Sequence, residues 1–157
     1  MIKLRQIIEL LAAHEVEIVI VGGVAMTLHG SAYMTFDLDV CYARPNENLR
    51  RLAAALSPHS PRPRDLPEAL PFVWDASTLR NGMNFTLSTD LGDVDLLGEV
   101  KGVGSYNEAR EASVIMQLYG YECRVFTLDA LIASKRAAGR PKDLLVLPEL
   151  EALREMS

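Results

Sequence analysis

Two acidic residues stand in an otherwise apolar stretch, as Asp37-Leu38-Asp39 within the run FDLDVCY (36–42). The run alternates and therefore predicts a strand, on which residues two apart point to the same face. The two carboxylates would repel each other and titrate abnormally unless a cation lay between them. Hard divalent cations, above all Mg²⁺, prefer such oxygen ligands. The alternative is a solvent-exposed strand face that carries two ordinary acids.

A third acid, Asp95, lies among the apolar residues Val94, Leu96 and Leu97. An acid in such a run either stands at the end of a strand or faces a polar site. Asp93 would share that face, but Gly92 beside it assigns Asp93 to a turn, and we therefore prefer Asp95. Three carboxylates from two strands would form a two-metal site, in which the metals clamp an attacking hydroxyl and a phosphoryl group.

A pair of glycines, Gly22-Gly23, ends the β-branched run EIVIVGG (17–23), which predicts a buried strand. A short helix over 24–30 is expected to follow directly. Glycines at this point would let a ligand approach the backbone closely, and the N–H groups that open the helix would face an anion such as phosphate. A tight turn from strand to helix without any ligand is the alternative interpretation.

Taken together, these blocks resemble the nucleotidyltransferase superfamily related to DNA polymerase β. Its pattern is Gly-Gly, a spacer, Asp-apolar-Asp and a third carboxylate on a neighbouring strand. The resemblance is closest to small bacterial nucleotidyltransferase-like proteins, including toxins of the AbiEii and MenT type, where the first block reads GG-x-A, HG and R-x-T-x-D-x-D. The matching residues here are Gly22, Gly23, Ala25, His29, Gly30, Thr35, Asp37 and Asp39. The stretch KRAAGRPKDL (135–144) resembles the same proteins, so the matching blocks span residues 19–144.

The resemblance implies Mg²⁺-dependent transfer of a nucleoside monophosphate from an NTP to an acceptor hydroxyl, with release of pyrophosphate. The acceptor would be an RNA or tRNA 3′ end, a protein side chain or a small molecule, and a toxin role would add an antitoxin protein as partner. The implied metal ligands and catalytic residues are Asp37, Asp39 and Asp95, and the implied nucleotide-binding residues are Gly22, Gly23, Thr35 and Lys135. Lys135 would neutralise charge on the leaving pyrophosphate, whereas a solvated helical lysine is its alternative interpretation.

The chain departs from the family pattern at Tyr33, where arginine is usual, and at Phe36, where Lys or Glu is common. Tyr33 favours a second hypothesis, a catalytically degenerate domain that binds a nucleotide or a partner protein. The three acids favour the enzyme. A third hypothesis is a metal-independent interaction domain in which the acids only decorate the surface.

The elements that must position these residues follow from hydrophobic periodicity and from turn and capping residues. They predict a mixed α/β (α+β) fold, a small twisted sheet flanked by helices, as in the nucleotidyltransferase fold. Residues 57–71 hold five of the eight prolines and are expected to form a loop, either a lid over the site or a long connection. The predicted helices are 2–13, 24–30, 45–56, 128–138 and 141–154, and the predicted strands are 17–23 paired with 36–42, a hairpin of 83–89 and 93–98, and a further pair within 113–127 that turns near Gly120.

Length and composition bound the class of protein. The 157 residues fit one domain, 1–157, and the chain is 49% hydrophobic and 24% charged with a net charge of −5. That charge argues against a protein that coats nucleic acid broadly, although the stretch Lys135–Lys142 holds four cations and no acid and favours RNA docking at one edge. Two cysteines in apolar surroundings and the lack of a signal peptide or membrane-spanning run predict reduced thiols and a cytoplasmic location with no membrane partner.

Overall fold

A seven-stranded mixed sheet organises the protein, whose computed structural model describes residues 1–157. The strands lie in the spatial order β3-β4-β5-β2-β1-β9-β8, and two further short strands pair only with each other. The sheet flanked by helices confirms the predicted fold class. The strands are β1 Ile18–Val21, β2 Asp37–Tyr42, β3 Arg62–Pro63, β4 Asn84–Thr89, β5 Gly92–Leu97, β6 Glu99–Val100, β7 Gly104–Ser105, β8 Ser113–Leu118 and β9 Tyr121–Phe126.

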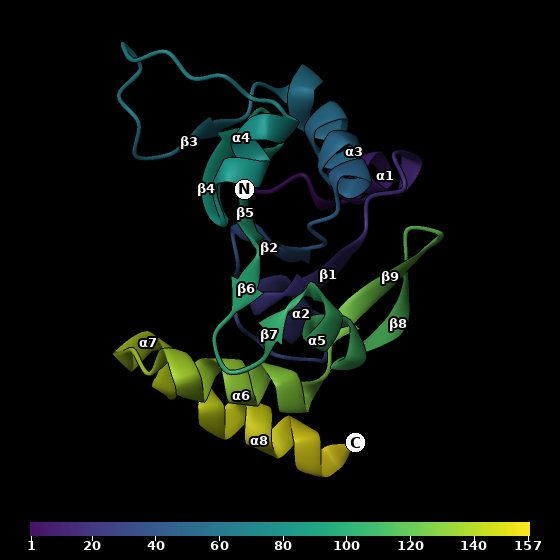
Figure 1. Cartoon of the computed structure of the whole chain (residues 1–157). Coiled ribbons are helices and arrows are strands. Elements are labelled where there is room, and N and C mark those ends of the chain that lie inside the picture. Colours follow the sequence, from purple (N-terminus) through teal and green to yellow (C-terminus); the bar gives the residue numbers. More distant parts are fainter.

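Helices lie on opposite sides of the sheet, with α1, α3 and α4 gathered at one side and α6 and α8 at the other (Figure 1). None of the helices combines the length and the apolar character needed to cross a membrane. The helices are α1 Leu4–Ala13, α2 Gly22–Leu28, α3 Asn46–Leu56, the 3₁₀ turn η1 Ser57–His59, α4 Ala76–Asn81, α5 Tyr106–Glu111, α6 Leu128–Ala138, α7 Pro141–Leu145 and α8 Leu147–Met156.

Backbone pairing and the burial of apolar side chains fix the three central strands of the sheet. β1 pairs antiparallel with β2, with Val21 opposite Asp39, and β2 pairs in parallel with β5, with Asp39 beside Asp95. Leu38, Val40, Val94 and Leu96 are buried in the core, whereas the acids between them lie on the opposite face of the sheet. Each fully buried leucine contributes roughly 1.5–3 kcal/mol to folding, so the apolar face sets the register that aligns the acids.

Several predicted elements have different bounds in the structure. The expected last helix, 141–154, is two helices that meet at Val146, because Pro148 lies in the first turn of α8 and interrupts the backbone hydrogen bonds. The expected loop 57–71 contains η1 and the edge strand β3. Gly22 and Gly23 form the first turn of α2 and not the end of the strand. The hairpin of 83–89 and 93–98 is confirmed as β4 and β5.

Two short helices, α4 and α5, were not predicted. Each has six residues, which is less than two turns, so neither presents a sustained apolar period. Their starting signals are local. Asp75 caps α4 by accepting a hydrogen bond from the N–H of Thr78, and Ser105 and Glu108 form a capping box at the start of α5.

A buried asparagine in α3 connects the start of β1 with the end of β2. Asn48 Oδ1 accepts a hydrogen bond of 2.7 Å from the N–H of Glu17, and Asn48 Nδ2 donates to the carbonyls of Glu17 at 3.1 Å and Ala43 at 2.8 Å. The side chain therefore holds the antiparallel pair β1–β2, which carries Asp37 and Asp39, against α3.

Replacement of Asn48 by alanine removes all three hydrogen bonds, including the buried one to the carbonyl of Ala43. We expect Asn48→Ala to lower the free energy of unfolding by about 3 kcal/mol in urea titrations. The exposed Asn107→Ala is the control and should change stability by less than about 0.5 kcal/mol. Equal stabilities for the two variants would contradict this role for Asn48.

Candidate active site

Three carboxylates converge on one face of the sheet. Asp37 and Asp39 of β2 and Asp95 of β5 each offer an oxygen atom, and these atoms lie within 4.8 Å of one another. The parallel register brings them together, because Asp39 is the direct neighbour of Asp95. Asp93, which the sequence assigned to a turn, instead belongs to β5 beside Asp37. Its side chain is 42% exposed and lies outside the cluster of three.

Burial and mutual repulsion among the acids raise the pKa of Asp39 strongly. Burial, followed by the charges of Asp95 and Asp37, raises the pKa of Asp39 from 3.8 to about 7. Burial and then Asp95 also raise the pKa of Asp37. Asp39 Oδ1 is buried and has no hydrogen-bond partner. Three carboxylates that lie this close, one with an unpaired buried oxygen, form an all-oxygen donor set that fits a hard divalent ion such as Mg²⁺.

The glycine pair and Thr35 lie against these acids. Gly22 has φ +64°, and a Cβ atom built on it would lie 2.2 Å from Asp39 Oδ2. A Cβ atom on Gly23 would lie 2.7 Å from Thr35 Oγ1 and 3.1 Å from Cε1 of Tyr33. The Thr35 hydroxyl donates a hydrogen bond of 3.0 Å to the carbonyl of Asp37. Because glycine has no side chain, the carboxylate of Asp39 and the loop before β2 can lie directly against residues 22 and 23.

An arginine that the sequence did not indicate completes one side of the cluster. Arg64 Nη2 lies 2.7 Å from Asp95 Oδ1, and Arg64 Nη1 donates to the carbonyl of Leu87 at 2.9 Å. The backbone N–H of Arg64 donates to Thr86, so β4 holds the residue in place. Arg64 belongs to the proline-rich segment 57–71, which therefore lines the site. Its neighbours in the sequence carry no periodic signal that would have identified it.

On the other side, Lys135 of α6 lies close enough to Asp39 to oppose the rise of its pKa. Lys135 Nζ lies 3.3 Å from Asp143 Oδ1, and Arg140 Nε lies 2.7 Å from Asp143 Oδ2. The Asp143 side chain is fully buried, and the hydrogen bonds from Arg140 and then from Lys135 lower its pKa. The partners of Asp143 are thus Lys135 and Arg140, and not its other basic neighbours Arg136 and Lys142. The short turn at Gly139 folds α7 back onto α6 and brings Asp143 to Lys135.

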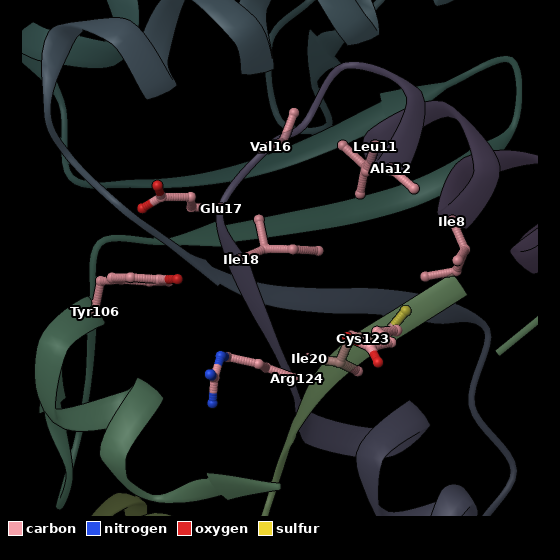
Figure 2. Close-up of a pocket in the computed structure, with 11 residues that line it drawn as sticks. Ile8, Leu11, Ala12, Val16, Glu17, Ile18, Ile20, Tyr106, Cys123 and Arg124 are labelled. Carbon is pink, nitrogen blue, oxygen red and sulfur yellow. The ribbon is translucent and has the colours of Figure 1, made fainter. Parts of the chain in front are cut away.

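Two ring side chains outside the cluster contact backbone carbonyl oxygens. His29 Nε2 lies 2.6 Å from the carbonyl oxygen of Phe126, and Trp74 Nε1 donates to Ala53 at 2.9 Å. A mainly apolar hollow of about 200 Å³ lies between α1, β1 and β9 (Figure 2). Ile8, Leu11 and Ile20 line it, and none of the three clustered acids does. The hollow is therefore separate from the candidate active site.

Comparison with solved structures shows which known fold the chain has. No protein-family model and no curated protein sequence matches the chain. One similar solved structure is a Thermotoga maritima protein proposed to be a nucleotidyltransferase, with a TM-score of 0.57, 16% identity and coverage of 99% of this chain and 94% of that one. The chain has the nucleotidyltransferase fold. A second similar structure is ANT(2″)-Ia in complex with adenylyl-2″-tobramycin, with a TM-score of 0.56, 14% identity and coverage of 98% and 93%.

The close approach of Gly22 to Asp39 can be tested by adding a methyl group. Gly22→Ala should destabilise the protein and displace the Asp39 carboxylate, because the Cβ atom would collide with Oδ2. Gly120→Ala is the matched control, since Gly120 also has a positive φ, +86°, but has nothing within 4 Å of an added Cβ atom. We expect Gly22→Ala to cost at least about 2 kcal/mol more than Gly120→Ala in urea unfolding. Equal costs would contradict the collision.

The raised pKa of Asp39 predicts how stability depends on pH in the metal-free protein. Folding favours the neutral carboxyl, so this contribution is full below about pH 4 and is lost as the pH rises through about 7. Asp39→Asn removes the titration, and we expect its melting temperature to exceed that of the wild type by about 5 °C or more at pH 8, with EDTA present.

The advantage of Asp39→Asn should shrink steadily between pH 8 and about pH 4. The exposed Asp65→Asn serves as the control and should follow the wild type throughout. Differential scanning fluorimetry across the pH series makes the measurement. An advantage that is the same at both ends of the series would mean that the substitution acts through packing and not through charge.

Proposed function

We propose that this protein is a Mg²⁺-dependent nucleotidyltransferase that moves a nucleoside monophosphate from an NTP to an acceptor hydroxyl. The observation that carries the proposal is the cluster of Asp37, Asp39 and Asp95, in which a buried oxygen of Asp39 has no partner. The nucleotidyltransferase fold supports it.

The three carboxylates would hold the metal. When bound, Mg²⁺ supplies positive charge to the phosphoryl oxygens and brings the acceptor oxygen into line with the α-phosphorus. Asp39, whose Oδ1 is buried and unpaired, is the ligand that gains most from the cation. Asp37 and Asp95 are more open to solvent on either side of it and can also reach a substrate.

Asp95 is suited to orient the acceptor and take its proton. Arg64 occupies Asp95 Oδ1, which leaves Oδ2 for the acceptor hydroxyl. As the acceptor oxygen forms its bond to the α-phosphorus, the bond from that phosphorus to the β-phosphate oxygen breaks. The hydroxyl proton goes to Asp95 Oδ2, and pyrophosphate leaves with the electron pair of the broken bond.

The remaining residues would bind the triphosphate. The backbone N–H groups of Gly22 and Gly23, at the start of α2 beside Asp39, would contact its oxygens, and Thr35 packs against Gly23 and holds the neighbouring loop. Lys135 would neutralise charge on the leaving pyrophosphate. Asp143 keeps the Lys135 ammonium group oriented within the fold.

The charge of the segment Lys135–Lys142 helps to choose between an RNA acceptor and a small-molecule or protein acceptor. Of the four cations in Lys135–Lys142, Lys135 and Arg140 share Asp143 and Arg136 pairs with Glu151, so two carboxylates of the same chain balance half of this positive charge. That arrangement weakens the case for RNA docking at this edge. ANT(2″)-Ia, a neighbour in fold, is bound to an adenylylated small molecule. A small-molecule or protein hydroxyl is therefore our preferred acceptor, with an RNA or tRNA 3′ end next.

A toxin restrained by an antitoxin, of the AbiEii or MenT type, is the biological role that the sequence resemblance supports. The competing candidate is a degenerate domain that binds a nucleotide or a partner without turnover. Tyr33 favours it, because an aromatic ring lies against Gly23 where the related pattern has arginine. The two candidates differ in one measurable property, which is transfer of label.

Incubation of the protein with each of four α-³²P NTPs, Mg²⁺ and fractionated cell extract tests the proposal. We expect label in one acceptor fraction with the wild type and a loss of about 1,000-fold or more with Asp39→Asn or Asp95→Asn. Lys135→Ala should lose about 100-fold in kcat, because it removes one charge from the leaving group. Lys101→Ala, an exposed lysine in the β6–β7 turn, is the control and should match the wild type.

A second readout separates the enzyme from the degenerate domain. Mg²⁺ should raise the melting temperature of the wild type and leave that of Asp39→Asn unchanged, whether or not an acceptor is known. Metal-dependent stabilisation with no transfer from any NTP would favour the binding domain. If Mg²⁺ does not stabilise the protein and no NTP gives transfer, the metal site itself is overturned.

A further inference from the structure

The two edges of the sheet are protected very differently. β3, at one edge, has only two residues, Arg62 and Pro63, and proline offers no N–H to an incoming strand. The Arg62 guanidinium also donates to the carbonyls of Pro67 and Leu70, which fold the following segment beside that edge. Such features are the usual means by which a sheet prevents pairing with another chain.

β8, at the opposite edge, has none of these features. Its six residues, Ser-Val-Ile-Met-Gln-Leu (113–118), include no charge and no proline. Its main packing partner is β9, so its other edge presents unpaired backbone groups. The β8–β9 hairpin projects from the body of the molecule (Figure 1), and β9 joins β1 near the base of the hairpin, through Ile20 and Val125.

The projecting hairpin exposes apolar side chains on both of its faces. Val114 and Ile115 are 41% and 53% exposed and point to opposite faces because they are consecutive on a strand. Tyr119 and Tyr121, at the tip, are also exposed. A long uncharged edge strand with exposed apolar side chains is a surface that a folded protein covers.

We propose that β8 pairs antiparallel with β8 of a second copy of this chain, about a two-fold axis, so that the two sheets become one. In such a pair, residues directly opposite each other point to the same face of the sheet. In the register centred on Met116, Val114 faces Leu118 of the other copy and Met116 faces its own copy, so every contact on that face is apolar. No like charges meet, because the strand carries none. One contact therefore covers both exposed edges, as an isologous interface requires.

The sequence of β8 favours a second copy over an unrelated peptide. A two-fold axis places each side chain next to itself or to a close neighbour, and a single Lys or Glu would then face its own charge. β8 lacks such residues although the chain as a whole is 24% charged. The acid cluster lies three strands away in the sheet order, so pairing leaves the candidate active site open.

Sedimentation equilibrium of the full chain, from about 1 to 100 µM, tests the pairing. We expect the mass of two chains, and we expect Val114→Lys and Ile115→Lys each to weaken the dimer at least about 100-fold. Leu145→Lys is the matched control, because Leu145 is 80% exposed at the end of α7, and it should remain dimeric. An unchanged circular dichroism spectrum would show that the variants are folded. A wild type that stays monomeric at the highest concentration overturns the proposal.

Single cysteines placed in turn at residues 113–118, in a Cys123→Ser background, distinguish this pairing from any other dimer. Only the residue on the two-fold axis meets its own copy, so one position should form a disulfide between the two chains under mild oxidation, and its neighbours should not. A dimer that survives both lysine substitutions, or that cross-links at no position of β8, would place the interface elsewhere and overturn the proposal.

Discussion

The register of β1, β2 and β5 is the constraint on which the rest of the structure depends. It sets Val21 opposite Asp39 and Asp39 beside Asp95, and Gly22 follows Val21 directly. A slip of one residue would turn the acids of one strand into the core and Leu38 or Val94 out of it. The apolar face therefore determines where three carboxylates stand. The free energy of burying that face holds like charges together that would otherwise separate.

The charge that the sheet gathers is balanced by cations from distant parts of the chain. Arg64 approaches Asp95 from the segment before β4, and Lys135 approaches Asp39 from α6. Asp143 in turn orients Lys135, so a residue outside the acid cluster supports a residue that borders it. The balance is incomplete at Asp39, whose buried oxygen has no partner. Asp39 Oδ1 and Arg62 Nε are the two buried polar side-chain atoms without a partner, and Asp39 Oδ1 is the one that lies where the proposed chemistry needs a cation.

Local patterns in the sequence predicted the parts of the fold that local forces determine. The alternation in FDLDVCY indicated β2, the turn at Gly92 indicated the β4–β5 hairpin, and the apolar periodicity indicated α1 and α3. The acids that the structure brings together are those whose spacing singled them out. Whether they bind a metal remains a prediction.

Contacts between distant residues could not be predicted in this way. β9 lies beside β1 although Ile20 and Val125 are far apart in the chain. The hydrogen bond from Arg64 to Asp95 joins residues that are 31 positions apart. Arg64 follows a proline in a segment with no period, so nothing nearby marks it. The partners of Asp143 depend on the turn at Gly139 between α6 and α7. The ends of the predicted helices locate this turn, but they do not determine the angle between the two helices.

The placement of Arg64 also bears on how a protein of this kind can diversify. The three acids stand on central strands, where neighbouring side chains leave little freedom to change. Arg64 stands at the start of a surface stretch, and most residues from Asp65 to Pro71 are exposed to solvent. Substitutions and insertions there are tolerated far more readily than in the sheet. Evolution can therefore reshape the side of the site next to Asp95, and with it the range of acceptors, while the metal-binding strands stay constant.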